Sequence, residues 1–211
     1  MMSTKDSSDT VNQNPRTLRL VWPQWQGAGV ESIREFFSEV PFEEARRGYA
    51  VGAAVLNAVL PAHSGPTALV PVESGDSGLS KQDGIEAKEA VVAQLARALE
   101  VIGRYNPQRI LTLGGECSVS VAPFSWLAKR YGDKLAVLWI DSHPDVGTPA
   151  SKYSGYHAMA MAVLTGHRDP DVLRLLPAIL DPTRVALVGL HSWGRRRFPQ
   201  HSPLGDQIVS S

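Results

Sequence analysis

A short segment of this 211-residue chain places three potential metal ligands at alternate positions. Asp141, His143 and Asp145 directly follow the apolar run 135–140 (LAVLWI), which is typical of a β-strand buried on both faces. In an extended segment the side chains at positions i, i+2 and i+4 point to one side, so we expect these three to face together. Two carboxylates and an imidazole make a face that suits a divalent cation.

Proline and glycine residues end this predicted strand. Pro144 and the turn at 147–149 (GTP) stiffen the loop, so the ligands would lie at the carboxyl end of a central strand, where open α/β sheets bind ligands. A lone acid or histidine after a strand is more commonly a turn residue or a helix cap. Three of them at alternate positions favour a metal site, because two carboxylates would otherwise crowd one turn without a neutralising charge.

A further candidate ligand, Cys117, follows the predicted strand 109–113 (RILTL). Gly114 and Gly115 allow a sharp turn after this strand and bring Cys117 to the start of a predicted helix over 119–131. The helix dipole and the free N–H groups at that end favour a thiolate. The residue is therefore a candidate metal ligand or nucleophile, and its alternative role is that of a small buried side chain.

Composition excludes several functional classes. Lys plus Arg equals Asp plus Glu at 21 each, so no overall field favours nucleic acid or an anionic membrane as a partner. The single cysteine excludes an intramolecular disulfide, and the first 16 residues lack the apolar core of a signal peptide. We therefore expect a cytoplasmic protein that binds neither nucleic acid nor membrane.

Over most of the chain, segments whose apolar residues are spaced as in a β-strand alternate with segments whose apolar residues are spaced as in an α-helix. Strands are expected over 17–22, 67–72, 109–113, 135–140 and 184–191, and helices over 30–40, 42–60, 84–104, 119–131, from about 157, and over 171–180. This alternation predicts an α/β protein, a three-layer α/β/α fold with a mainly parallel sheet. We expect a disordered leader over 1–16, one α/β domain over 17–193 and an irregular tail over 194–211. Phosphate-binding glycine loops are absent, so a nucleotide cofactor is not expected.

Three motifs in this order resemble those of the arginase/agmatinase (ureohydrolase) family. GGECS at 114–118, DSHPD at 141–145 and SGYHAM at 154–159 are similar to the family's G-G-[DE]-H-S, D-A-H-x-D and S-G-N-x-H-G-M, and the resemblance spans roughly 18–191. It implies an arginase-like α/β/α fold with a binuclear Mn²⁺ centre. It also implies hydrolysis of a C–N bond in a guanidine or amidine compound, usually with release of urea.

The resemblance implies roles for individual residues. Asp141 would bridge two metal ions, His143 would bind one of them, and Asp145 would bind the other. Cys117 stands where the family usually has a metal-binding histidine, and a thiolate suits Zn²⁺ or Fe²⁺ better than Mn²⁺. His157 matches the family's histidine near the substrate, a proton shuttle, so His157 and Asp145 are the expected catalytic residues.

The substrate-binding positions depart from the family. Ser154 and Gly147 are the expected substrate-binding residues, but Gly147 stands where arginases have an asparagine that recognises an amino acid. The segment SGYH lacks both the asparagine and one residue of the usual loop. The expected substrate is therefore a small guanidino or amidine compound other than L-arginine.

The family's third metal motif, D-x-D-x-x-D-P on a later strand, has no counterpart after His191. We therefore expect a divergent member shortened at its C-terminus, with a fold incomplete there, doubtful activity and a tendency to form a homo-oligomer. Two other functions stay open. One is a catalytically silent, metal-binding member with a role in assembly or regulation, and the other is an amide hydrolase with Cys117 as nucleophile and a histidine as base.

Overall fold

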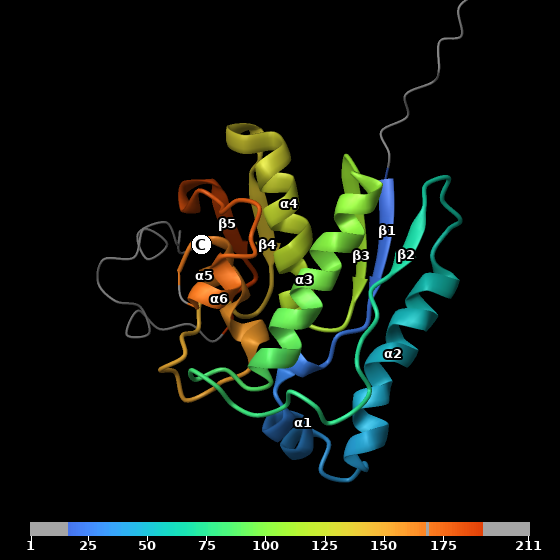
Figure 1. Ribbon diagram of the computed structural model, residues 1–211, viewed down its shortest axis with the longest axis vertical. Helices are drawn as coiled ribbons and strands as arrows, with labels where there is room; N and C mark the ends of the chain where they lie inside the picture. The colour runs from blue at the N-terminus through green and yellow to red at the C-terminus, as the bar shows by residue number, and fades with distance from the viewer. Residues whose placement is uncertain (1–16, 168, 192–211) are drawn as a thin grey trace, which may run out of the picture.

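The computed structural model describes residues 17–167 and 169–191, in which strands alternate with helices (Figure 1). The strands are β1 (Thr17–Trp22), β2 (Thr67–Leu69), β3 (Arg109–Gly114), β4 (Val137–Ile140) and β5 (Val185–Val188). The helices are α1 (Val30–Phe36), α2 (Phe42–Val59), α3 (Lys88–Tyr105), α4 (Val121–Tyr131), α5 (Ala160–Leu164) and α6 (Pro170–Leu173). The expected leader and tail lie outside the described residues.

The strands form two parallel sheets. One has the order β2-β1-β3, and the other pairs β4 with β5. The short strand β2 lies at a sheet edge, as expected for a segment that Pro71 interrupts. The predicted α/β class with parallel pairing is confirmed.

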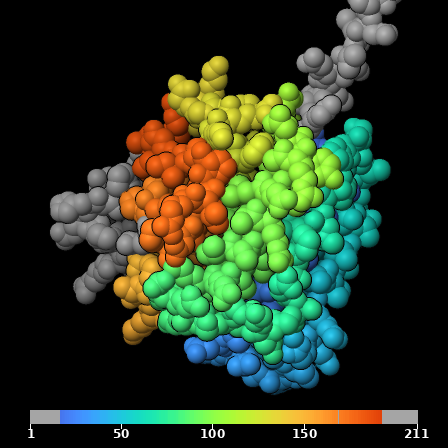
Figure 2. Space-filling model, in the orientation of Figure 1, coloured from blue at the N-terminus to red at the C-terminus, as the bar shows by residue number. Residues whose placement is uncertain are grey.

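The main core lies between the sheets and helices α3 and α4, which stand in front of the strands in Figure 1. Leu18, Leu20 and Trp22 alternate along β1 and are buried, because every second side chain of a strand points to the same face. Leu95 and Ile102 belong to the apolar stripe of α3 in the same core cluster. Figure 2 shows the segment 73–87, which precedes α3, spread over the lower front of the molecule.

The expectation that β4 is buried on both faces is wrong. Val137 and Trp139 are buried, whereas Leu138 and Ile140 are 61% and 74% exposed. Val188, which lies opposite Ile140 on β5, is also exposed. An unbroken apolar run indicates a strand, but whether both faces are covered depends on elements elsewhere in the chain. We call the residues of this uncovered side, Leu138, Ile140, Ala186 and Val188, the outer face of β4–β5.

Several predicted helices are shorter than expected. The first turn of α3 is delayed to Lys88, because Ala87 has a left-handed backbone conformation with φ of 52°. α6 has only four residues, capped at its start by the Asp169 side chain. The helix expected from Val119 is preceded by a 3₁₀ turn, η2 (Cys117–Ser120). Within residues 17–167 and 169–191, every helix is too short or too polar to cross a bilayer.

Candidate metal centre

The structure gathers Cys117, Asp141 and Asp145 into one cluster. Each offers one ligand atom, and these three atoms lie within 4.8 Å of one another. The Cys117 Sγ lies 3.5 Å from the Asp141 Oδ2. Cys117 follows β3 and the two aspartates follow β4, so the cluster forms at the carboxyl ends of parallel strands, the lower ends in Figure 1.

The position of Cys117 depends on Gly115. The Gly115 N–H donates to the Trp22 carbonyl at 3.1 Å, which joins the loops after β3 and β1. A Cβ at Gly115 would lie 1.6 Å from the Gln24 carbonyl oxygen, so no other residue fits this approach of two backbones. The chain then enters η2 with Cys117 as its first residue, as the sequence predicted.

A polar network behind Cys117 holds the same loop. The Gln24 Nε2 donates to the Glu116 Oε1 at 2.7 Å and to the Ser118 Oγ at 2.8 Å. The Ser118 N–H donates to the Glu116 Oε2 at 2.8 Å, so the Glu116 side chain caps η2. Burial raises the pKa of the Glu116 carboxyl, and the hydrogen bonds from Gln24 and Ser118 oppose that rise. Sequence reasoning missed this network. The one sequence feature that could have indicated it is that Gln24 and Glu116 each lie two residues after the end of a strand, β1 and β3, and these strands are parallel neighbours.

Asp145 has a backbone conformation that is rare for a residue with a side chain, with φ of 48°. Such a conformation costs on the order of 1–3 kcal/mol and persists only where surrounding contacts impose it. Here the Asp145 carbonyl accepts hydrogen bonds from the N–H groups of Met161 and Ala162 in α5, at 2.9 and 3.2 Å. The side chain is 4% exposed, and its Oδ2 has no hydrogen-bond partner among the described residues.

The electrostatics of the cluster fit a divalent cation. Burial, then the charge of Asp141, raises the pKa of Asp145 to about 7. Burial and both carboxylates likewise raise the pKa of the Cys117 thiol. A buried carboxylate oxygen without a partner costs free energy, and a cation is the partner that would relieve it and lower both pKa values. One thiol and two carboxylates suit Zn²⁺ or Fe²⁺ in particular.

His143 lies outside this cluster in the structure. Its N–H donates to the Asp141 Oδ1 at 2.9 Å, a turn that ends the extended chain directly after β4. Its side chain is 65% exposed, with Nδ1 3.8 Å from the Asp141 Oδ1. The prediction that alternate spacing would point Asp141, His143 and Asp145 to one side is therefore wrong, because the segment is a turn and not a strand.

His157 is half-buried on the 3₁₀ turn η4 (Tyr156–Met159), which packs against η2. Its Nε2 lies 2.7 Å from the Tyr153 Oη. Burial, aided by nearby His143, lowers the pKa of His157 to about 4. The imidazole is therefore neutral at physiological pH. Sequence reasoning singled out His157 but missed Tyr153, which lies four residues earlier in the loop before η4.

The predicted substrate-binding residues have internal partners. The Ser154 side chain is buried, and its Oγ donates to the Glu86 Oε1 at 2.7 Å. The Gly147 N–H donates to the Ala158 carbonyl at 2.7 Å, and a Cβ at Gly147 would lie 2.7 Å from that same oxygen. Position 147 therefore accepts no side chain in this loop conformation.

A second group of acids, Asp83, Asp169 and Asp171, already surrounds a cation of the protein. The Lys88 Nζ lies 2.5, 2.7 and 2.8 Å from their respective Oδ2 atoms. Its side chain is 7% exposed, so the ammonium fills the space that an ion would need. This group joins the starts of α3 and α6 and is not a second metal site.

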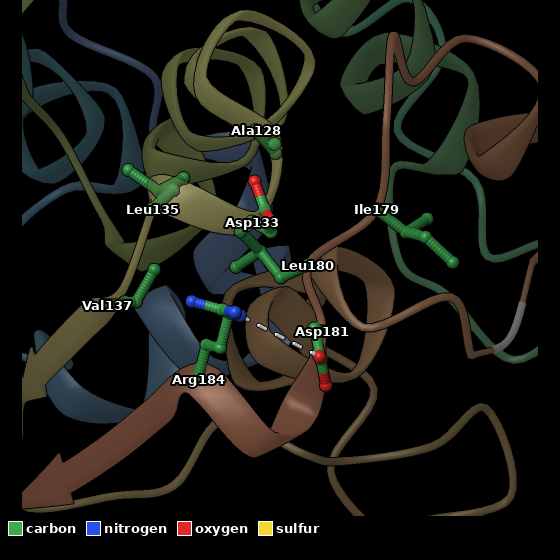
Figure 3. Close-up of a pocket in the computed structure, with 9 residues that line it drawn as sticks. Ala128, Asp133, Leu135, Val137, Ile179, Leu180, Asp181 and Arg184 are labelled. Atoms are coloured by element: carbon green, nitrogen blue, oxygen red, sulfur yellow. Dashed lines mark ion pairs between the residues drawn. The ribbon is translucent and has the colours of Figure 1, made fainter.

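A small cavity lies at the other end of the β4–β5 sheet (Figure 3). Leu135 and Val137 line it from the start of β4, and Leu180 lines it from the segment before β5. Asp181 and Arg184 form an ion pair there at 3.9 Å. At about 210 Å³ the cavity is smaller than typical ligand sites. It holds none of the predicted site residues.

The low pKa of His157 predicts a pH-dependent contribution to stability. The pKa falls from 6.5 to about 4 on folding, so the unfolded chain binds this proton more readily. The stabilisation is fully present above pH 6.5 and is lost as pH falls towards 4, by about 3 kcal/mol in total. We expect urea unfolding to show this loss in the parent but not in His157→Gln. Parallel stability curves for the two proteins between pH 7.5 and 4 would contradict it.

Comparisons with known proteins agree with this architecture. The model of the "Arginase family" matches residues 40–209. An arginase of Staphylococcus aureus (strain MSSA476) is 30% identical over 134 residues, which cover 61% of this chain and 44% of the relative. An arginase of Bacillus caldovelox is 31% identical over 132 residues, 60% of this chain and 42% of the relative. The chain thus spans less than half the length of these relatives.

Solved structures show the same fold. The crystal structure of Entamoeba histolytica arginase in complex with L-ornithine superposes with a TM-score of 0.60 at 20% identity, covering 84% of this chain and 59% of that one. The native structure of the Bacillus caldovelox arginase gives a TM-score of 0.56 at 21% identity, with 84% and 58% covered. The expected arginase-like α/β fold is confirmed.

Proposed function

Because this chain belongs to the arginase family, we propose that it is a metal-dependent hydrolase that cleaves a C–N bond of a small guanidino or amidine compound. One observation carries the proposal. Cys117, Asp141 and Asp145 bring three ligand atoms within 4.8 Å of one another, and a buried carboxylate oxygen of Asp145 lacks a hydrogen-bond partner among the described residues. This is a donor set for a divalent cation at the edge of the sheet where α/β proteins bind ligands.

The proposed roles follow from the positions of the side chains. Cys117, Asp141 and Asp145 would hold the ion, and His143 would be a further ligand, since its largely exposed imidazole can turn towards Asp141 at little cost in packing. A bound divalent ion lowers the pKa of a coordinated water and so supplies hydroxide at neutral pH. His157 is neutral and can take up a proton and deliver it to the departing amine.

The proposed substrate is not L-arginine. The relatives above are named arginases, but their identity to this chain is about 30% over less than half of their length. Position 147, where arginases have a recognition asparagine, has no room for a side chain beside the Ala158 carbonyl. Ser154 stays a predicted substrate contact, which would require its hydroxyl to leave Glu86.

The identity of the metal depends on Cys117. A thiolate ligand favours Zn²⁺ or Fe²⁺ over Mn²⁺, and an imidazole in its place is more compatible with Mn²⁺. We expect Cys117→His to raise the affinity for Mn²⁺ relative to Zn²⁺ about tenfold or more. Competition dialysis with elemental analysis measures the ratio.

Thiol labelling is the control for the role of Cys117, the chain's one cysteine. If the sulfur binds Zn²⁺, the ion should slow alkylation of the parent by iodoacetamide. Equal rates with and without Zn²⁺, together with an unchanged metal preference in Cys117→His, would exclude the residue as a ligand.

Two other functions are candidates for this chain. An amide hydrolase with Cys117 as nucleophile needs a thiolate beside a base, but the Cys117 thiol faces two carboxylates that raise its pKa. A catalytically silent, metal-binding member is the second candidate. The observation in its favour is that the described residues gather only one thiol and two carboxylates at the cluster.

We also propose that copies of the chain associate through the outer face of β4–β5. Apolar patches of this kind favour association, and the formal net charge of zero gives no general repulsion. We expect the double substitution Leu138→Ser/Ile140→Ser to increase the monomer fraction in light scattering. Val59→Ser, which changes an exposed valine on α2, should leave it unchanged. A parent that is monomeric at high concentration would contradict the proposal.

A cytoplasmic location and a lack of nucleic-acid or membrane partners stay predictions.

A further inference from the structure

The hydroxyl of Tyr153 has hydrogen-bond partners on Ala28 and His157 that constrain its single proton, and the Ser32 side chain is a third partner. The Oη is 2.5 Å from the Ala28 carbonyl oxygen and 2.7 Å from the His157 Nε2. A carbonyl oxygen has no proton, so at 2.5 Å the phenol must donate to Ala28. The phenol oxygen can then only accept from His157, which requires a proton on Nε2.

We propose that Tyr153 is a positioning residue that fixes His157 in the tautomer protonated at Nε2, so that Nδ1 is the basic nitrogen of the site. A neutral imidazole has one N–H and one lone pair, and the hydrogen bond at one nitrogen decides the state of the other. Because the phenol donates to a backbone carbonyl, side-chain rotation cannot easily reverse this choice.

The surroundings of Tyr153 hold the arrangement in place. The next residue, Ser154, is joined to Glu86 twice, by its Oγ at 2.7 Å and by its carbonyl, which accepts from the Glu86 N–H at 3.0 Å. The Glu86 carboxylate also accepts from the Glu31 N–H at 3.2 Å, at the start of α1. Burial raises the pKa of Tyr153 to about 12, so the phenol keeps its proton at neutral pH.

The consequence for chemistry rests on the function proposed above. His157 lies on η4, which packs against η2, the turn that begins with Cys117. With Nε2 engaged by Tyr153, proton transfer at this site would run through Nδ1. The tautomer itself is independent of any bound metal or turnover, so it can be tested whether or not the chain hydrolyses a guanidino compound.

Long-range ¹H–¹⁵N correlation spectra of the ¹⁵N-labelled full chain at neutral pH test the proposal, because they distinguish the two neutral tautomers of a histidine. The signals of His157 are those lost in His157→Gln. We expect the parent to show the Nε2–H pattern, and Tyr153→Phe to shift His157 towards a mixture or towards Nδ1–H.

Tyr131→Phe is the matched control. The Tyr131 Oη also donates to a backbone carbonyl, that of Gln108 at 2.7 Å, but it has no histidine partner among the described residues. It should leave the His157 signals unchanged. An Nδ1–H pattern in the parent would overturn the proposal even if Tyr153→Phe failed to fold, and so would an unaltered pattern in a folded Tyr153→Phe.

Discussion

Replacing Asp141 with alanine is expected to abolish metal binding by the purified chain. The Asp141 carboxylate is one of three candidate ligands whose atoms lie within 4.8 Å of one another, with its Oδ2 3.5 Å from the Cys117 Sγ. Without it, one thiol and one buried carboxylate would have to bind a dication with at most His143 as a third ligand. The affinity should then fall by more than about a hundredfold, which exceeds the usual effect of losing a hydrogen bond to a ligand. Elemental analysis after dialysis against Zn²⁺ or Mn²⁺ measures the loss.

Asp83→Ala is the matched control for this substitution. It removes a carboxylate from the other three-acid group, where the Lys88 ammonium already supplies the positive charge, so metal content should not change. The more demanding test is the double variant Asp141→Ala/His143→Ala. If this protein kept the metal content of the parent, the binding site would lie elsewhere in the chain.

The sequence was sufficient to predict that Cys117 and Asp141 each lie in a loop directly after a strand. Apolar runs followed by glycine or by acids indicate strands that end in loops, and helices between them require parallel pairing. β3 and β4 belong to different sheets, so the approach of the Cys117 Sγ and the Asp141 Oδ2 to 3.5 Å, across 24 residues of sequence, is known only from the structure. The placement of each residue after its strand follows from local pattern, whereas their meeting does not.

The conformation after β4 could not be predicted in this way. Alternate spacing gives a common direction only while the chain is extended, and the turn at Asp141 ends the extension at once. Asp145 then returns to the cluster in a left-handed conformation that local preference disfavours. The N–H groups that hold this conformation belong to Met161 and Ala162, and the sequence around Asp145 gives no indication that they contact it.

The supporting hydrogen bonds were also beyond the sequence. Gln24 and Glu116 are 92 residues apart, and Ala28 and Tyr153 are 125 residues apart. Polar residues in loops are too common to be paired without knowledge of the fold, and a backbone carbonyl such as that of Ala28 has no signature in the sequence. The hydrogen bonds that hold Cys117 and His157 in place therefore emerge only from the structure.

The 211-residue chain is expected to hydrolyse guanidino compounds very slowly. The binuclear centre that the family resemblance implies needs carboxylates that bridge and neutralise two dications. Within residues 17–167 and 169–191, the candidate centre gathers Cys117, Asp141 and Asp145, and the other acidic group is filled by Lys88. The donor set at the centre is enough for one ion, even if His143 turns inward.

One ion can activate water but lacks the second contact that stabilises the attacking and leaving groups. A guanidinium is a poor electrophile, so the missing contact should raise the barrier by several kcal/mol and lower the rate on the order of a thousandfold or more. Urea release from agmatine and 4-guanidinobutyrate, measured with Mn²⁺ and with Zn²⁺ on monodisperse protein, tests this expectation. Asp141→Ala prepared in parallel reports any contaminating hydrolase. Turnover near about one per second in the parent but not in that variant would mean that carboxylates outside this cluster complete the site, since ordinary enzymes work at roughly that rate or above.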